Sequence, residues 1–144
     1  MRRALPILVR LSRWRVKERQ KELAAQQAIY DALLQEDESL RQSLARECDI
    51  LRQKPEVGVT FGAYLQAGQS RRRALARALR EAEEAVEKSR TILLEAFAEQ
   101  KRYEIAQDKK QAEERQEEQR RATADLDEIG AQRHRRRRHG QGTI

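Results

Sequence analysis

The sequence predicts an all-α protein in which two long helices fold back on each other as an antiparallel coiled-coil hairpin. The chain has 144 residues, of which 38% are charged and only 4% aromatic. Such a composition, rich in Ala, Glu, Gln, Arg and Lys, is typical of long exposed helices. Hydrophobic residues recur at every seventh position in two segments, and a cluster of helix-breaking residues separates these segments.

The first arm, residues 1–53, contains two columns of residues spaced by seven. One column consists of Val9, Val16, Leu23, Tyr30, Asp37, Leu44 and Leu51. The other consists of Leu5, Ser12, Arg19, Gln26, Leu33, Leu40 and Glu47. Two columns offset by three and four residues form the buried seam of a coiled coil. Asp37 is the one polar interruption in the first column, and the seam is most apolar toward residue 51.

Residues 54–70 are predicted to connect the two arms, because they contain Pro55, Gly58, Gly62 and Gly68. Proline lacks the amide that a helix interior needs and disfavours the helical conformation of the residue before it. Each glycine inside a helix costs about 1 kcal/mol relative to alanine. We therefore expect the chain to turn back here, with room for a short helical turn.

The second arm, residues 71–130, supplies the matching seam. One of its columns is Leu79, Val86, Leu93, Gln100 and Gln107, and the other is Leu75, Ala82, Ser89, Ala96 and Tyr103. These columns match those of the first arm when the numbers of facing residues sum to about 119. Leu44 then faces Leu75, and Asp37 faces Ala82. This register centres the turn near residues 59–60. A register shifted by seven residues would align the columns equally well.

The sequence becomes almost entirely polar after residue 106, and charges of both signs alternate. In the same register the first arm ends opposite Glu118, so the helix beyond that point has no partner in this chain. Charged pairs three and four residues apart stabilise such a helix by only about 0.2–0.5 kcal/mol each. We expect this helix to be stabilised by binding to another protein. Residues 131–144 are predicted to form a basic, flexible tail.

Positive charge is concentrated in two segments. Residues 1–21 carry a net charge of +7, and the five arginines of residues 133–138 raise the total of the two segments to +12, against −5 elsewhere. A hairpin brings both segments to one end. That end is expected to bind an acidic surface, which charge alone does not identify as nucleic acid, anionic lipid or protein. The tail residues concerned are Arg133, Arg135, Arg136, Arg137 and Arg138.

Two sets of apolar residues are candidates for partner binding. Ile7, Leu11 and Trp14 lie off the seam with i, i+4, i+7 spacing, so they form an outward stripe or pack locally at the end of the helix. At the connection, a second set spaced i, i+3, i+4 either packs over the turn or forms another binding surface. That second set is Phe61, Tyr64 and Leu65.

Motifs for catalysis, cofactors and metals are absent from the sequence. It has no glycine-rich phosphate loop and no nucleophile paired with a base, so an enzyme is not expected. His134 and His139 stand in an arginine run and lack further metal ligands. The apolar run before Arg10 is too short to span a membrane. The single Cys48 fits a reducing compartment, so a cytoplasmic protein is expected.

Several short motifs, in this order, resemble the FliJ family of flagellar export proteins. They are Leu11-Ser12-Arg13-Trp14, Phe61-Gly62-Ala63-Tyr64, Arg71-Arg72-Arg73-Ala74-Leu75, Lys101-Arg102-Tyr103-Glu104, Leu126-Asp127-Glu128-Ile129-Gly130 and Arg133-His134-Arg135-Arg136. The resemblance spans nearly the whole chain. The stalk proteins of virulence type III secretion are related and similar in sequence pattern.

This resemblance implies a stalk, similar to the central shaft of rotary ATPases, in the cytoplasmic part of a type III export apparatus. The basic end, with Ile7, Leu11, Trp14 and residues 133–138, would bind the hexameric export ATPase. The surface of Phe61, Tyr64 and Leu65 would address the membrane export gate, giving a peripheral association with the inner membrane.

The resemblance also implies binding of export chaperones, but it assigns no residues to that role. Two other classes of function stay open. One is a nucleic-acid-binding coiled coil, which is less favoured because no aromatic residues are interleaved with the arginine tail. The other is a self-associating structural coiled coil that uses the outward stripe as its dimer seam.

Overall fold

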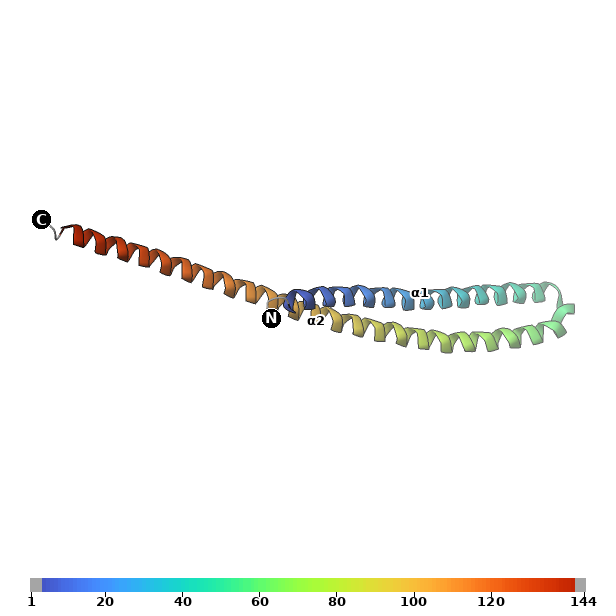
Figure 1. Ribbon diagram of the computed structural model, residues 1–144. Helices are drawn as coiled ribbons and strands as arrows, with labels where there is room; N and C mark the ends of the chain where they lie inside the picture. The colour runs from blue at the N-terminus through green and yellow to red at the C-terminus, as the bar shows by residue number, and fades with distance from the viewer. Residues whose placement is uncertain (1–3, 142–144) are drawn as a thin grey trace. The chain divides into compact units, whose positions relative to one another are not determined.

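The computed structural model describes residues 4–141, the side chains of Val57 and Gln141 excepted. Helix α1 spans Ala4–Gln53, the short 3₁₀ helix η1 spans Pro55–Val57, and helix α2 spans Gly58–Gln141. The two long helices pack against each other as an antiparallel hairpin, which confirms the predicted fold class (Figure 1). Contacts divide the chain into two units, one of Leu11–Gln100 and one that joins the chain up to Arg10 with the chain from Lys101.

The buried residues of the two helices follow the predicted heptad columns. The buried side chains are Val9, Ser12, Val16 and Leu44 on α1, and Leu75, Ala82, Val86 and Ala96 on α2. Gly68 is buried too and lies one heptad before Leu75, so the column continues toward the turn. Because burying a Val or Leu side chain contributes roughly 1.5–3 kcal/mol, this seam is the main source of stability in the paired region.

The turn is much shorter than the predicted connection of residues 54–70. Lys54 adopts φ −133° and ψ 84°, the extended conformation that a following proline favours. Its amide still donates to the Ile50 carbonyl oxygen at 2.9 Å, which completes α1. After one turn of 3₁₀ helix, α2 begins at Gly58 with right-handed helical dihedral angles. Of the predicted breakers, only Pro55 interrupts the helices, while Gly62 and Gly68 lie inside α2.

The register differs from the predicted one by a heptad. Leu44 lies against Gly68, because a Cβ built on that glycine would sit 2.6 Å from the Leu44 Cδ2 atom. The predicted partner, Leu75, is seven residues further along α2, so the predicted turn centre at residues 59–60 is wrong as well. Heptad columns look the same after a shift of seven residues, and the short turn selects between the two registers. The Arg15–Glu99 ion pair, at 2.9 Å, fits the observed register.

Helix α2 is exposed to solvent over its last third. Residues as far as Lys110 include half-buried side chains, whereas all residues over 111–140 are exposed. Pairing therefore ends before the predicted point opposite Glu118. The helix nevertheless continues through Gly130 to Gln141. The prediction of a flexible tail over 131–144 is thus wrong for residues 131–141, and residues 142–144 lie outside the described part of the chain. The segment 111–141 is called the solitary helix below (Figure 1).

Across residues 4–141, no helix combines the length and the apolar character that crossing a lipid bilayer requires.

Candidate functional site

The predicted apolar stripe on α1 points into solvent. The exposed fractions are 59% for Ile7, 39% for Leu11 and 57% for Trp14. Neighbouring positions on the same helix, Val9 and Ser12, are buried in the seam. Local packing at the start of the helix therefore does not cover the stripe. Its large side chains are available as anchors for another protein, a role in which tryptophan is enriched.

The arginines of the tail are exposed side chains on the solitary helix. Pairing with α1 ends near Lys110, and Arg133 follows roughly 35 Å further along the helix at 1.5 Å per residue. Within this unit, Arg10 on α1 and the tail arginines thus lie far apart. The prediction that both basic segments form one plug is wrong, because the plug required the chain to be paired nearly to its end. The structure instead presents the five arginines of residues 133–138 on one unaccompanied helix.

The predicted surface at the turn is only partly exposed. Phe61 and Leu65 are half-buried, since they lie two heptads before the seam residues Leu75 and Leu79. Tyr64 is 42% exposed, and the centroid of its ring lies 6.4 Å from that of Phe61. Packing over the turn thus accounts for two of the three residues. Tyr64 and Val59, which is 95% exposed, are the exposed large apolar residues at the start of α2.

Helix α2 carries exposed apolar residues that the sequence prediction missed. Leu94 is 67% exposed and Phe97 is 42% exposed, and they lie three residues apart off the seam. Ile105, in the other unit, is 59% exposed. The spacing rule that identified Ile7 and Trp14 on the first arm would have found these residues too.

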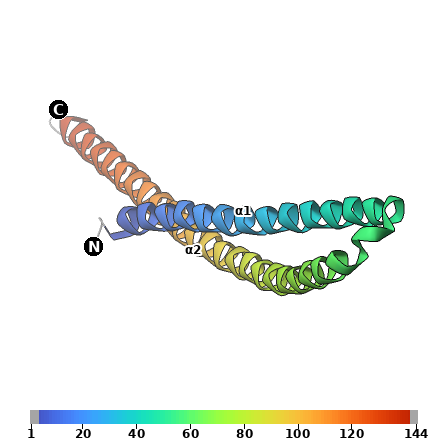
Figure 2. The same cartoon turned by 90° about the vertical axis from the view of Figure 1, so that its right-hand side faces the viewer.

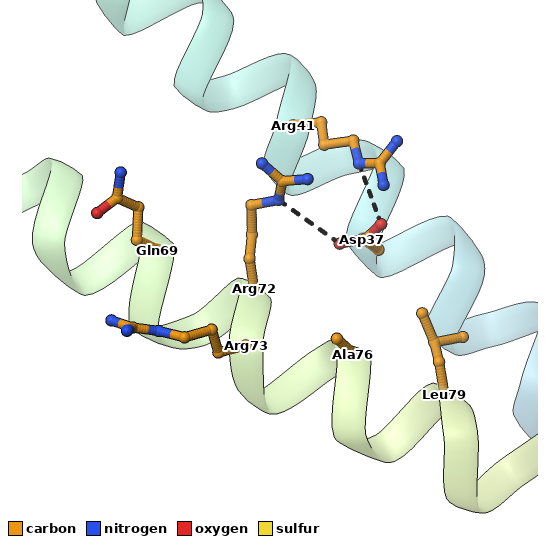
Figure 3. A pocket seen from close by; sticks show the side chains of 7 residues that line it. All are labelled: Asp37, Arg41, Gln69, Arg72, Arg73, Ala76 and Leu79. Atoms are coloured by element: carbon orange, nitrogen blue, oxygen red, sulfur yellow. Dashed lines mark ion pairs between the residues drawn. The ribbon is translucent and has the colours of Figure 1, made fainter.

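A cleft lined by charged and apolar residues, called the cationic cleft below, lies between the two helices. Its volume is about 470 Å³, and it is lined by Asp37, Arg41, Gln69, Arg72, Arg73, Ala76 and Leu79 (Figure 3). Asp37 was predicted to face Ala82, and this is wrong, because its carboxylate contacts Arg72 across the helix pair. The heptad shift in register brings these two residues together. Figure 2 shows α2 bowing away from α1 in this part of the hairpin.

Comparison with protein-family models, curated proteins and solved structures gave no match to this chain. Among residues 4–141, no three His, Cys, Asp or Glu side chains gather into a possible metal site. The surfaces described above are suited to binding: an apolar stripe with a tryptophan, an arginine-rich helix, a small patch at the turn and a cationic cleft.

Proposed function

We propose that the chain is the cytoplasmic stalk of a flagellar type III export apparatus, binding the hexameric export ATPase at one end and the membrane export gate at the other. The supporting observations are the antiparallel hairpin, the order of FliJ-like motifs along the chain and the exposed surfaces. The observation that carries the proposal is the arginine-bearing solitary helix, in which every residue over 111–140 is exposed.

The ATPase-binding element in this proposal is α2 beyond the end of α1. Over residues 111–140 every residue of this helix is exposed, and the segment 111–141 extends roughly 46 Å at 1.5 Å per residue. Its five arginines at residues 133–138 would complement an acidic lining of the ATPase pore. Binding inside the hexameric ATPase would stabilise the helix. The exposed Trp14 on α1 adds an apolar anchor. Arg133, Arg135, Arg136, Arg137 and Arg138 contribute mainly to the rate and specificity of association.

The turn is the gate-facing end in this proposal. Tyr64 and Val59 provide the exposed contact, while Phe61 and Leu65 keep the end rigid through the seam. The seam over residues 11–100 stiffens the helix pair, and in this proposal the pair transmits a displacement from the ATPase to the gate. The chain itself hydrolyses nothing in this mechanism. Its association with the inner membrane is peripheral and indirect.

Binding to a purified export ATPase tests the first contact. A variant with Arg135→Glu, Arg136→Glu and Arg137→Glu should lose most of its ATPase affinity while the hairpin melts at the same temperature. Trp14→Ala should weaken binding at least about tenfold, as expected for a buried anchor. Ile29→Ala is the matched control, because Ile29 is also an exposed apolar residue of α1, at 51%. Equal binding by all four proteins would refute the proposal.

Two rival functions are separated in the same experiment. Tight binding of duplex DNA at physiological salt without ATPase binding would indicate a nucleic-acid-binding protein. A dimeric mass that returns to monomer in Trp14→Ala would indicate a self-associating coiled coil. Binding to a virulence-system ATPase in preference to the flagellar enzyme would assign the chain to the related secretion system.

The gate contact is tested at the turn. Tyr64→Ala should reduce binding to the cytoplasmic domain of the export gate protein and leave ATPase binding intact. Leu34→Ala serves as the control, since Leu34 is 43% exposed in the middle of α1. Binding of export chaperones is measured with the same variants. This shows whether either surface contacts them.

A further inference from the structure

The cationic cleft between α1 and α2 contains a shared ion pair that crosses the hairpin. The Arg41 Nε atom lies 3.2 Å from Asp37 Oδ2, and the Arg72 Nε atom lies 3.9 Å from Asp37 Oδ1. Two guanidinium groups from different helices thus converge on one carboxylate, as Figure 3 shows. The Asp37 side chain is only 14% exposed, so its position is fixed within the cleft.

Both arginines contact Asp37 through the Nε edge, and their terminal Nη groups are not in these ion pairs. Two terminal amino groups on each guanidinium are the donors that bind carboxylate or phosphate oxygens in bidentate fashion. Asp37 therefore orients the guanidinium groups of Arg41 on α1 and Arg72 on α2, and leaves their terminal amino groups available to a ligand. Arg73, which also lines the cleft beside Gln69, has no ion-pair partner among residues 4–141.

The charge of the cleft selects the class of ligand. Three arginines and one aspartate line it, leaving two uncompensated positive charges. The neighbouring Arg71 and Glu36 form an ion pair, so together they add no net charge near the cleft. A phosphate monoester carries about −1.5 to −2 at pH 7 and has three acceptor oxygens, so it matches both the charge and the donors. A carboxylate would neutralise only half of the excess charge.

The remaining lining suits an organic group attached to the phosphate. Ala76 and Leu79 give the α2 side of the cleft an apolar surface. The volume of about 470 Å³ falls within the range of small-molecule pockets, roughly 300–1,000 Å³. We infer that the cleft is a binding site for a small phosphorylated molecule, held through Arg41 and Arg72 with Arg73 as a third contact. This inference is independent of the stalk function proposed above.

The site exists in only one of the two heptad registers. In the alternative pairing Asp37 faces Ala82, and Arg72 is displaced by about 10 Å along the helix pair. The two guanidinium forks then no longer meet. A phosphate that binds only the observed register therefore stabilises it by RT ln(1 + [L]/Kd).

Calorimetric titration of the 144-residue chain with AMP, orthophosphate and adenosine in about 0.15 M NaCl tests the site. AMP and orthophosphate should both bind, with AMP tighter because its organic part covers Ala76 and Leu79. Adenosine should not bind. Equal affinities of AMP and orthophosphate would identify free phosphate as the ligand and would still support the oxyanion site. Binding of neither would overturn the inference.

Variants distinguish a built site from general electrostatics. Arg41→Gln and Arg72→Gln should each weaken AMP binding about tenfold, the loss expected for one charged hydrogen-bonding group. Arg80→Gln is the matched control, since it removes an exposed α2 arginine outside the cleft. Arg72→Lys keeps the charge and removes the fork, so it should weaken binding at least about threefold. Wild-type affinity in Arg72→Lys, or an equal loss in Arg80→Gln, would refute the site.

Discussion

Helix α2 has the same secondary structure in two different environments. Over residues 58–110 it lies along α1, and its seam side chains are buried or half-buried. Over residues 111–140 all its side chains are exposed. The paired part is helical because its apolar face is buried, whereas the solitary part depends on intrinsic propensity and on pairs such as Arg121 with Glu117, which lie 3.5 Å apart.

The comparison shows where rigidity and adaptability lie in the chain. A seam worth many kcal/mol holds residues in the hairpin, while local pairs worth a few tenths of a kcal/mol each hold the solitary helix. A segment of the second kind gains order when it binds, and this suits it to recognise a partner. The following experiments test this contrast, beginning with the largest expected effect.

Truncating a leucine in each environment should give very different losses of stability. Leu75 is 2% exposed, so Leu75→Ala should lower the free energy of unfolding by about 2–5 kcal/mol. Leu126 on the solitary helix is 69% exposed, and Leu126→Ala should change it by less than about 0.5 kcal/mol. Urea unfolding followed by circular dichroism measures both. Similar losses in the two variants would show that residues 111–141 are packed against something in solution.

Hydrogen exchange should separate the two parts of α2 along a single helix. Amides between Leu75 and Ala96 open only when the hairpin unfolds, whereas those between Gln111 and Arg138 open by local fraying. A difference of about 3 kcal/mol in opening free energy corresponds to roughly a 100-fold difference in exchange rate. Mass spectrometry of peptic peptides resolves the two segments. Adding the export ATPase should slow exchange in the solitary helix, and unchanged exchange there would argue against its role in the ring.

The sequence predicted the paired region well because the heptad period has a direct physical cause. Burial of one face repeats every seven residues, and the buried residues Val9, Val16, Leu75 and Ala96 stand in the predicted columns. The same period cannot fix the register, because a shift of one heptad superimposes the columns. Gly68 was interpreted as a breaker, but in the structure the missing side chain makes room for Leu44.

The candidate surfaces were predicted less completely. The outward position of Trp14 followed from spacing alone, and the structure agrees. The cleft required Asp37 and Arg72 to meet, which depends on the register and therefore could not be predicted. Residues 131–141 are helical although their charge pattern predicts a flexible tail, because arginine has a high helix propensity.

Replacing glycines inside α2 tests the fit of the seam near the turn. A Cβ on Gly62 would meet nothing within 4 Å, so Gly62→Ala should stabilise the hairpin by about 0.5–1 kcal/mol. A Cβ on Gly68 would lie 2.6 Å from Leu44 Cδ2, and Leu44 is buried. Gly68→Ala should therefore cancel the helix gain and leave stability at or below that of the wild type. A gain in Gly68→Ala equal to that in Gly62→Ala would place the two helices further apart than described here.

The smallest effect concerns single ion pairs, and it bears most directly on how each part of α2 is held. Glu117→Gln removes the pair with Arg121 and should lower the helix content of the solitary segment, because a helix without tertiary support responds to losses of about 0.2–0.5 kcal/mol. Glu87→Gln removes the pair with Arg90, at 2.7 Å, on paired α2. It should leave the helix content unchanged, since the seam keeps these residues helical.

Far-ultraviolet circular dichroism of the two variants makes this comparison at low salt and at about 1 M NaCl, where the Debye length falls to about 3 Å. The deficit of Glu117→Gln relative to the wild type should disappear at high salt, because screening removes the same attraction in the wild type. A deficit that persists would mean that Glu117 supports the helix through contacts other than the pair with Arg121. An equal loss of helix content in Glu87→Gln would mean that burial of the seam does not keep the paired part of α2 helical. The contrast between the two environments would then fail.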